Sequence, residues 1–160
     1  MQRREMVLRF LRAVVISFEF LFLICGVVLF LYRERLQALG VFVQNYEVVK
    51  WGALLPSGLL VWTLKSWKKI REPVSDHVKF YQQWEGFESV KIVCVAGVFY
   101  AVSAAIGGVI LLAFSGIICR TCITIGLGVV ISVSCVCALT MYMAEMRLPE
   151  LLNKLDDTGM

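Results

Sequence analysis

The sequence predicts an all-α integral membrane protein, a bundle of four transmembrane helices whose N- and C-termini both lie in the cytosol. Hydrophobic residues make up 59% of the 160-residue chain and charged residues only 18%, below the roughly 25% that is usual for soluble globular domains. The apolar residues come in runs that approach the ~20 residues needed to cross a bilayer core as a helix. Backbone groups in lipid must be hydrogen-bonded within the protein, so these runs are expected to be helical.

Four apolar runs define the expected spans, which together form one membrane domain: residues 13–32, 43–64, 92–114 and 121–144. The last two contain no Asp, Glu, Lys or Arg, and the first is interrupted only by Glu19.

The second span is the most polar, because it begins with Gln44, Asn45, Glu47 and Lys50. Glu47 and Lys50 are three residues apart and would be neighbours on one helical face. We expect a full crossing, with a re-entrant or tilted segment as the alternative, and a protein partner that covers these polar side chains.

Basic residues determine the expected orientation, because cytosolic loops of membrane proteins are enriched in Lys and Arg. They gather in the N-terminal tail and between the second and third spans: Arg3, Arg4, Arg9, Arg12, Lys65, Lys68, Lys69, Arg71 and Lys79. The opposite side carries Arg33, Arg35 and Arg120. The C-terminal tail, residues 145–160, is therefore expected in the cytosol, and the first span is expected to be a retained signal anchor.

Residues 65–91 are predicted to lie on the cytosolic leaflet as an interfacial segment, with membrane lipids as partners. Its basic and aromatic residues expected to face lipid are Lys65, Trp67, Lys68, Lys69, Arg71, Phe80 and Trp84. The net charge of +4 arises largely from this topological bias, so nucleic-acid binding is not expected.

Small residues in the third span predict close helix packing. Gly97, Ala101 and Ala105 follow one another at four-residue spacing, and Gly107 and Gly108 repeat that spacing with Ser103 and Ala104, respectively. Such rows let helix backbones approach each other in lipid, where no hydrophobic force brings helices together.

Glu19 is the main anomaly within the spans. A lone carboxylate at its depth costs on the order of 2.5 kcal/mol or more, so it should face protein or water, or be protonated. By depth, its possible partners are Tyr100, Ser103 and Thr140. The residue could bind a proton or cation, could contact a partner's helix, or could share a hydrogen bond inside the bundle.

The chain has six cysteines, of which Cys119 and Cys122 form a CxxC motif at the exoplasmic end of the fourth span. A helix N-terminus and the adjacent Arg120 favour a thiolate there, and disulfides persist on the exoplasmic side. A redox pair, a structural disulfide and simple apolar packing are all compatible with the pattern.

The stretch CRTCIT (residues 119–124) resembles the redox motif of the vitamin K epoxide reductase family, small membrane enzymes of the endoplasmic reticulum that reduce quinones. The resemblance implies that Cys119 and Cys122 would be the active pair. That family relays electrons through a second cysteine pair in a long lumenal loop, whereas residues 33–44 here contain no cysteine.

The stretches GALLPSGLLVWTL (52–64) and SGIICRTCIT (115–124) are similar to parts of the keratinocyte-associated protein 2 family, whose members are accessory subunits of the oligosaccharyltransferase. This likeness implies an accessory role. No metal site or cofactor is expected, since the single histidine, His77, lies in the cytosolic segment.

The expected function is an accessory, scaffold or assembly subunit of a larger membrane complex, rather than an enzyme, with another integral membrane protein or a second copy of the chain as partner. A thiol–disulfide redox protein using Cys119 and Cys122 is the first alternative, and a proton or ion transport component using Glu19 is the second. The compartment is the endoplasmic reticulum, another endomembrane or the plasma membrane.

Overall fold

The computed structural model describes residues 17–38, 46–71 and 85–157. Across these residues the chain forms four α-helices: α2 (Phe18–Leu31), α3 (Tyr46–Arg71), α5 (Glu85–Ala113) and α6 (Arg120–Asp157). The predicted all-α fold class is therefore confirmed. The N-terminal arginines, His77 and Lys79 lie outside the described residues.

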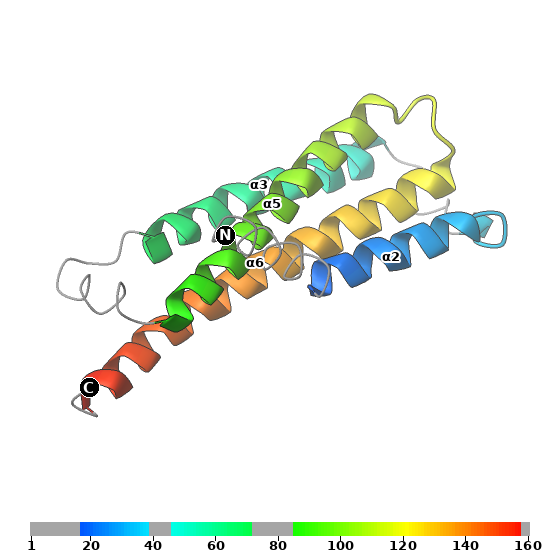
Figure 1. Ribbon diagram of the computed structural model, residues 1–160. Helices are drawn as coiled ribbons and strands as arrows, with labels where there is room; N and C mark the ends of the chain where they lie inside the picture. Colours follow the sequence, from blue (N-terminus) through cyan, green and yellow to red (C-terminus); the bar gives the residue numbers. More distant parts are fainter. Residues whose placement is uncertain (1–16, 39–45, 72–84, 158–160) are drawn as a thin grey trace, which may run out of the picture.

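Successive helices run in opposite directions along one common axis (Figure 1). Helices α3, α5 and α6 pack against one another, and α2 lies along α6. We call the end that holds the turn after α2 and the loop of residues 114–119 the disulfide end. The opposite end, where the last turns of α3 carry Lys65, Lys68 and Lys69, is the lysine end.

The core consists of three clusters of buried side chains arranged along the bundle. Ile70, Cys94 and Met141 form the cluster at the lysine end. The middle cluster contains Tyr100, Ala101, Ala104, Val133 and Cys137. The cluster nearest the disulfide end contains Val49, Ala53, Ile123 and Leu127. The first joins α3, α5 and α6, the middle one joins α5 to α6, and the last joins α3 to α6, so every cluster includes side chains of α6.

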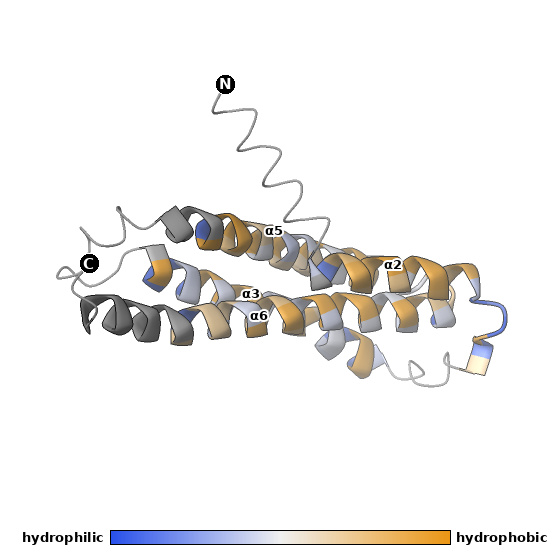
Figure 2. Cartoon of the chain, turned by 60° about the horizontal axis from the view of Figure 1, so that its bottom comes forward, coloured by the Kyte–Doolittle hydropathy of each residue, from blue (hydrophilic) through white to orange (hydrophobic). Residues whose placement is uncertain are grey.

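The outer surface of the bundle is apolar over most of its length, as the orange faces of Figure 2 show. Helix α2 exposes nearly every large side chain from Leu21 to Leu31, since it contacts the rest of the bundle along one narrow face. Soluble proteins rarely expose contiguous apolar surface on this scale. The surface is therefore of the kind that a bilayer or a protein partner covers.

Within the described residues, two helices are long and apolar enough to cross a membrane, Val90–Ala113 of α5 and Arg120–Met146 of α6. The apolar segment Glu19–Leu31 is shorter. Helix α3 is not among the candidates, and it carries Glu47 and Lys50 in its first turns. Two of the four expected spans thus have the required length and composition.

The helices extend beyond the expected spans at the lysine end. Helix α3 continues to Arg71, α5 already begins at Glu85, and α6 continues to Asp157. Both ends of the expected interfacial segment, residues 65–71 and 85–91, are thus continuations of α3 and α5. The reason is that Lys, Arg and Glu are good helix formers, so the loss of apolar character does not end the helix.

Candidate functional site

The loop between α5 and α6 is a compact turn that places Cys119 at the start of α6. The Ser115 hydroxyl donates to the Leu112 carbonyl at 2.8 Å, and the backbone N–H of Ile118 donates to the Phe114 carbonyl at 3.0 Å. Gly116 has open space around it. These bonds satisfy groups at the end of α5 and reverse the chain within a few residues.

Cys119 and Cys122 form a disulfide across the first turn of α6, with their Cα atoms 5.3 Å apart. The backbone N–H of Cys122 donates to the Cys119 sulfur at 3.3 Å. Cys119 is exposed, whereas Cys122 is only 8% exposed. The two sulfurs therefore differ in access. Among the described residues the remaining cysteines are free thiols: Cys25, Cys94, Cys135 and Cys137.

Exposed apolar residues precede the disulfide, and a core residue follows it. Ile123 is buried in the cluster nearest the disulfide end, and Ile118 packs against that cluster. In the loop before the disulfide, Ile117 is 82% exposed and Phe114 is also exposed. Arg120 is exposed directly after Cys119. The disulfide, a cation and exposed apolar side chains thus lie within a few residues of one another.

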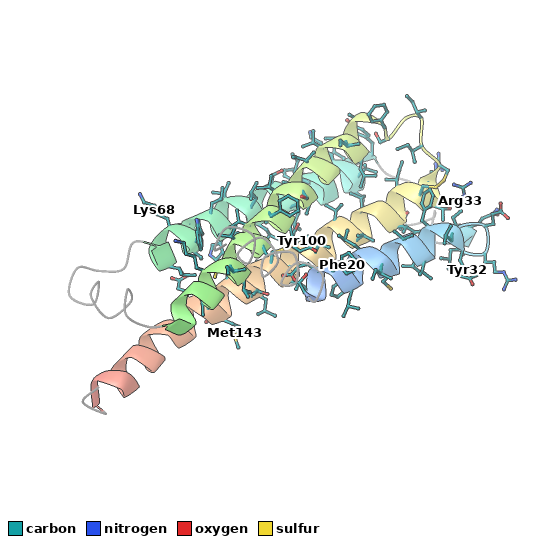
Figure 3. The ribbon with its side chains drawn as sticks, in the orientation of Figure 1. Phe20, Tyr32, Arg33, Lys68, Tyr100 and Met143 are labelled. Atoms are coloured by element: carbon teal, nitrogen blue, oxygen red, sulfur yellow. A yellow bond between two sulfur atoms is a disulfide. The ribbon has the colours of Figure 1, made fainter. Side chains whose placement is uncertain are left out.

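Glu19 lies inside the bundle, where it is only 5% exposed. It stands in the first turn of α2, whose N-cap Ser17 accepts a hydrogen bond from the Phe20 N–H at 3.3 Å. The carboxyl interacts with the thiol of Cys137, which is fully buried on α6. Phe20 packs against the cluster that contains Tyr100 and Cys137 (Figure 3). The position of Glu19 makes it unavailable to a partner's helix.

Two of the partners expected for Glu19 bond to their own helices instead. The Ser103 hydroxyl donates to the Phe99 carbonyl at 2.9 Å, and the Thr140 hydroxyl donates to the Val136 carbonyl at 2.9 Å. Cys137 was not among the expected partners, because the register between α2 and α6 cannot be read from depth alone. The feature of the sequence that could have identified Cys137 is its thiol, a weak hydrogen-bond donor that lies about one turn before Thr140.

The small residues of α5 lie against two different helices. A Cβ atom added to Gly108 would stand 2.6 Å from the Ala53 carbonyl oxygen of α3. Added to Gly97 or Gly107, it would stand 3.5 Å from Met141 or 3.3 Å from Val130, both on α6. Ala101 and Ala105 are buried. The row therefore packs between α3 and α6 rather than toward the outside.

At the lysine end, an ion pair joins α3 to α6. Lys69 Nζ is 2.6 Å from Glu145 Oε1, and Ser66 also hydrogen-bonds the Glu145 carboxylate. Trp67 packs against the cluster at the lysine end, whereas Lys68 points away from the bundle (Figure 3). Nothing is described of Phe80, Trp84 or the side chain of Arg71.

The first turns of α3 present Glu47 and Lys50 outward, both exposed. The neighbouring Val49 and Ala53 face inward and are buried. Gln44 and Asn45 fall outside the described residues.

The described residues contain no group of three His, Cys, Asp or Glu side chains placed to hold a metal ion. The geometry can support thiol–disulfide chemistry at one end of the bundle and helix docking along α3. No family model, curated protein or solved structure matches the chain.

Proposed function

We propose that the chain is a four-span integral membrane protein with cytosolic termini that serves as an accessory, scaffold or assembly subunit of a larger membrane complex. The observation that carries this proposal is an exposed row along one face of α3. Its members, which we call the outer α3 stripe, are Glu47, Lys50, Leu54, Gly58, Val61 and Lys65.

Membrane insertion is supported by the apolar outer surface of the bundle. Side chains such as Val27, Ile106 and Leu139, from three different helices, are all more than half exposed. Exposing each of these apolar side chains to water would be unfavourable, whereas in lipid they need not be buried against protein. The alternating helix directions would let the four helices cross the bilayer in succession.

The orientation is supported by two independent features at opposite ends of the bundle. The lysine end carries the cations expected on the cytosolic side. The disulfide end carries the bond that persists in exoplasmic compartments. Both features favour the same orientation.

The residues of the outer α3 stripe have the spacing of a helix–helix contact face. Its members follow one another at intervals of three or four residues, which keeps them on one face of the helix. A Cβ atom added to Gly58 would meet nothing within 4 Å, so a second helix could approach closely there. A transmembrane helix with complementary polar groups fits this face.

The docking proposal is tested by filling the open space beside Gly58 with a larger side chain. Gly58→Leu should lower recovery of a stoichiometric membrane partner in mild detergent by about tenfold or more, because the larger side chain keeps the partner's helix away. Gly128→Leu is the matched control, since Gly128 on α6 is also exposed with nothing within 4 Å of an added Cβ. Partner recovery is measured by quantitative mass spectrometry.

A photo-reactive residue at Leu54 gives a second readout. It should crosslink to one protein of defined mass, whereas the same residue at Ile106 on α5 should crosslink mainly to lipid. Equal recovery with both leucine variants, or a monodisperse monomer without a partner, would overturn the proposal.

A further inference from the structure

We propose that the Cys119–Cys122 disulfide is a thiol–disulfide exchange site that oxidises a pair of cysteine thiols in a polypeptide at the exoplasmic membrane surface. Attack occurs at Cys119, and Cys122 is the leaving group. This activity goes beyond the docking role and does not depend on it, because the disulfide belongs to α6 and the residue before it and shares no residue with the outer α3 stripe.

Unequal exposure of the two sulfurs selects the point of attack. An incoming thiolate must approach one sulfur along the line of the S–S bond. Cys119 is exposed and Cys122 is almost fully buried. The mixed disulfide therefore forms on Cys119, and the Cys122 sulfur leaves.

The local backbone stabilises both thiolates that the exchange creates. Cys122 lies in the first turn of α6, where the helix dipole favours negative charge. The Cys119 sulfur already accepts a hydrogen bond from the Cys122 N–H at 3.3 Å. The exposed Arg120 adds a cation next to it. Stabilised thiolates are good leaving groups in disulfide exchange.

The exchange balances without a further reactant. A substrate thiol loses its proton, and the resulting thiolate attacks the Cys119 sulfur, which breaks the S–S bond and leaves a thiolate on Cys122. The second substrate thiol loses its proton, and that thiolate attacks the substrate sulfur of the mixed disulfide and releases Cys119 as a thiolate. The two protons end on Cys119 and Cys122. One disulfide is consumed and one is formed.

The exposed apolar patch formed by Phe114 and Ile117 defines the substrate class. These side chains lie a few residues before the attacked sulfur, and Ile117 is the most exposed large hydrophobic side chain described. They would contact apolar residues that flank the substrate's cysteines. A polypeptide with an apolar segment fits better than a small hydrophilic thiol.

A purely structural role explains the disulfide less well. The stabilisation that a crosslink provides grows with the length of the loop that it closes. This one has a sequence separation of 3, within a turn that α6 already forms with its own hydrogen bonds. A crosslink placed there contributes little to tertiary stability.

The test uses the purified full chain in nanodiscs and a reduced peptide that carries two cysteines between leucines. Wild type should oxidise one peptide per disulfide lost, as measured by mass spectrometry after alkylation. Cys122→Ser, first converted to its mixed disulfide with glutathione at Cys119, should transfer that bond to the peptide, whereas Cys119→Ser should do so at least tenfold more slowly. Thermal unfolding of both variants checks that they remain folded.

The apolar patch is tested separately. Ile117→Ser should slow exchange with the leucine peptide by about tenfold, but should not change exchange with a matched peptide in which serines replace the leucines. A disulfide that resists both peptides over hours, equal reactivity of the two single variants, or an Ile117→Ser effect on both peptides would overturn the proposal. Binding of the membrane partner by the Cys119→Ser variant is scored separately, so failure here leaves the docking proposal intact.

Discussion

Gly108 shows how one residue determines the distance between two helices. An added Cβ atom would stand 2.6 Å from a backbone oxygen of α3, which cannot move aside as a flexible side chain can. Without a hydrophobic force between helices in lipid, such close backbone contact is a main source of association.

Gly108→Ala is therefore expected to destabilise the bundle by about 1–3 kcal/mol, since overpacking forces the backbones apart. Gly128→Ala is the control, because its added Cβ meets nothing and alanine favours the helix by up to about 1 kcal/mol. Thermal unfolding in one detergent compares the two. Equal shifts would mean that α3 and α5 are not in contact at Gly108.

Glu19 is expected to act through its shape and hydrogen bonding. Glu19→Gln keeps both and should change the free energy of unfolding by less than about 1 kcal/mol, whereas Glu19→Ala should cost roughly 1–3 kcal/mol, because it removes the partner of the Cys137 thiol. Denaturant unfolding in detergent measures both. A glutamine variant as unstable as the alanine variant would contradict this view.

The transport alternative makes a different prediction for the same substitution. If Glu19 carries protons across the bilayer, Glu19→Gln should abolish proton flux into liposomes, since an amide cannot release the proton. An unchanged rate would remove that role and leave the packing role.

At the residue scale, the sequence identified Glu19, the CxxC motif and the glycine row, but it supplied only some of their partners. Depth along a span can be counted from residue numbers, and for Glu19 it pointed to Tyr100, Ser103 and Thr140. Tyr100 lies in the buried cluster against which Phe20 packs, whereas the hydroxyls of Ser103 and Thr140 bond to their own helix carbonyls. The rotation of each helix about its axis determines which groups meet, and a nearly uniform apolar sequence does not reveal that rotation.

At the element scale, α3 combines an inward face with the outer α3 stripe. Pro56 lies inside this helix and is buried, yet the helix continues from Tyr46 to Arg71. The part of the expected span from Tyr46 to residue 64 is helical, and the helix continues to Arg71, because lysines end the apolar run without ending the helix.

The ion pair between Lys69 and Glu145 joins the ends of α3 and α6 at a solvated site, where the side chains are 60% and 27% exposed. A double-mutant cycle with Lys69→Met and Glu145→Gln should give a coupling energy of about 0.2–1 kcal/mol. The coupling should fall at high ionic strength, because exposed charges are screened. Lys68→Met with Glu145→Gln is the control cycle. A coupling above this range that salt does not change would indicate a desolvated pair.

At the scale of the whole molecule, composition predicted an all-helical chain, and the basic residues and the cysteines favoured one orientation. The sequence did not predict which helices would pack against one another. The central position of α6, with α2 on one side and α3 and α5 on others, follows from side-chain shape along its whole surface. Two of the described helices meet the length and composition criteria for a membrane crossing, whereas a crossing by α2 and α3 belongs to the proposed topology.

The orientation is tested by glycosylation mapping in microsomes. An acceptor site in a long flexible insert at Gly116, which has open space around it, should be glycosylated, because the proposed topology places this loop in the lumen. The same insert after the last residue should remain unmodified. Glycosylation of the second and not the first would invert the topology and would place the disulfide in the cytosol.

The length of α6 has a consequence for where the proposed bundle would meet the two membrane surfaces. Its candidate span of 27 residues measures about 40 Å at 1.5 Å per residue, with Arg120 and Glu145 near its two limits. A bilayer measures about 40–45 Å when its headgroup regions are included. In the proposed orientation, Arg120 and Glu145 would therefore both lie among headgroups, one at each surface, and would hold α6 at a fixed depth.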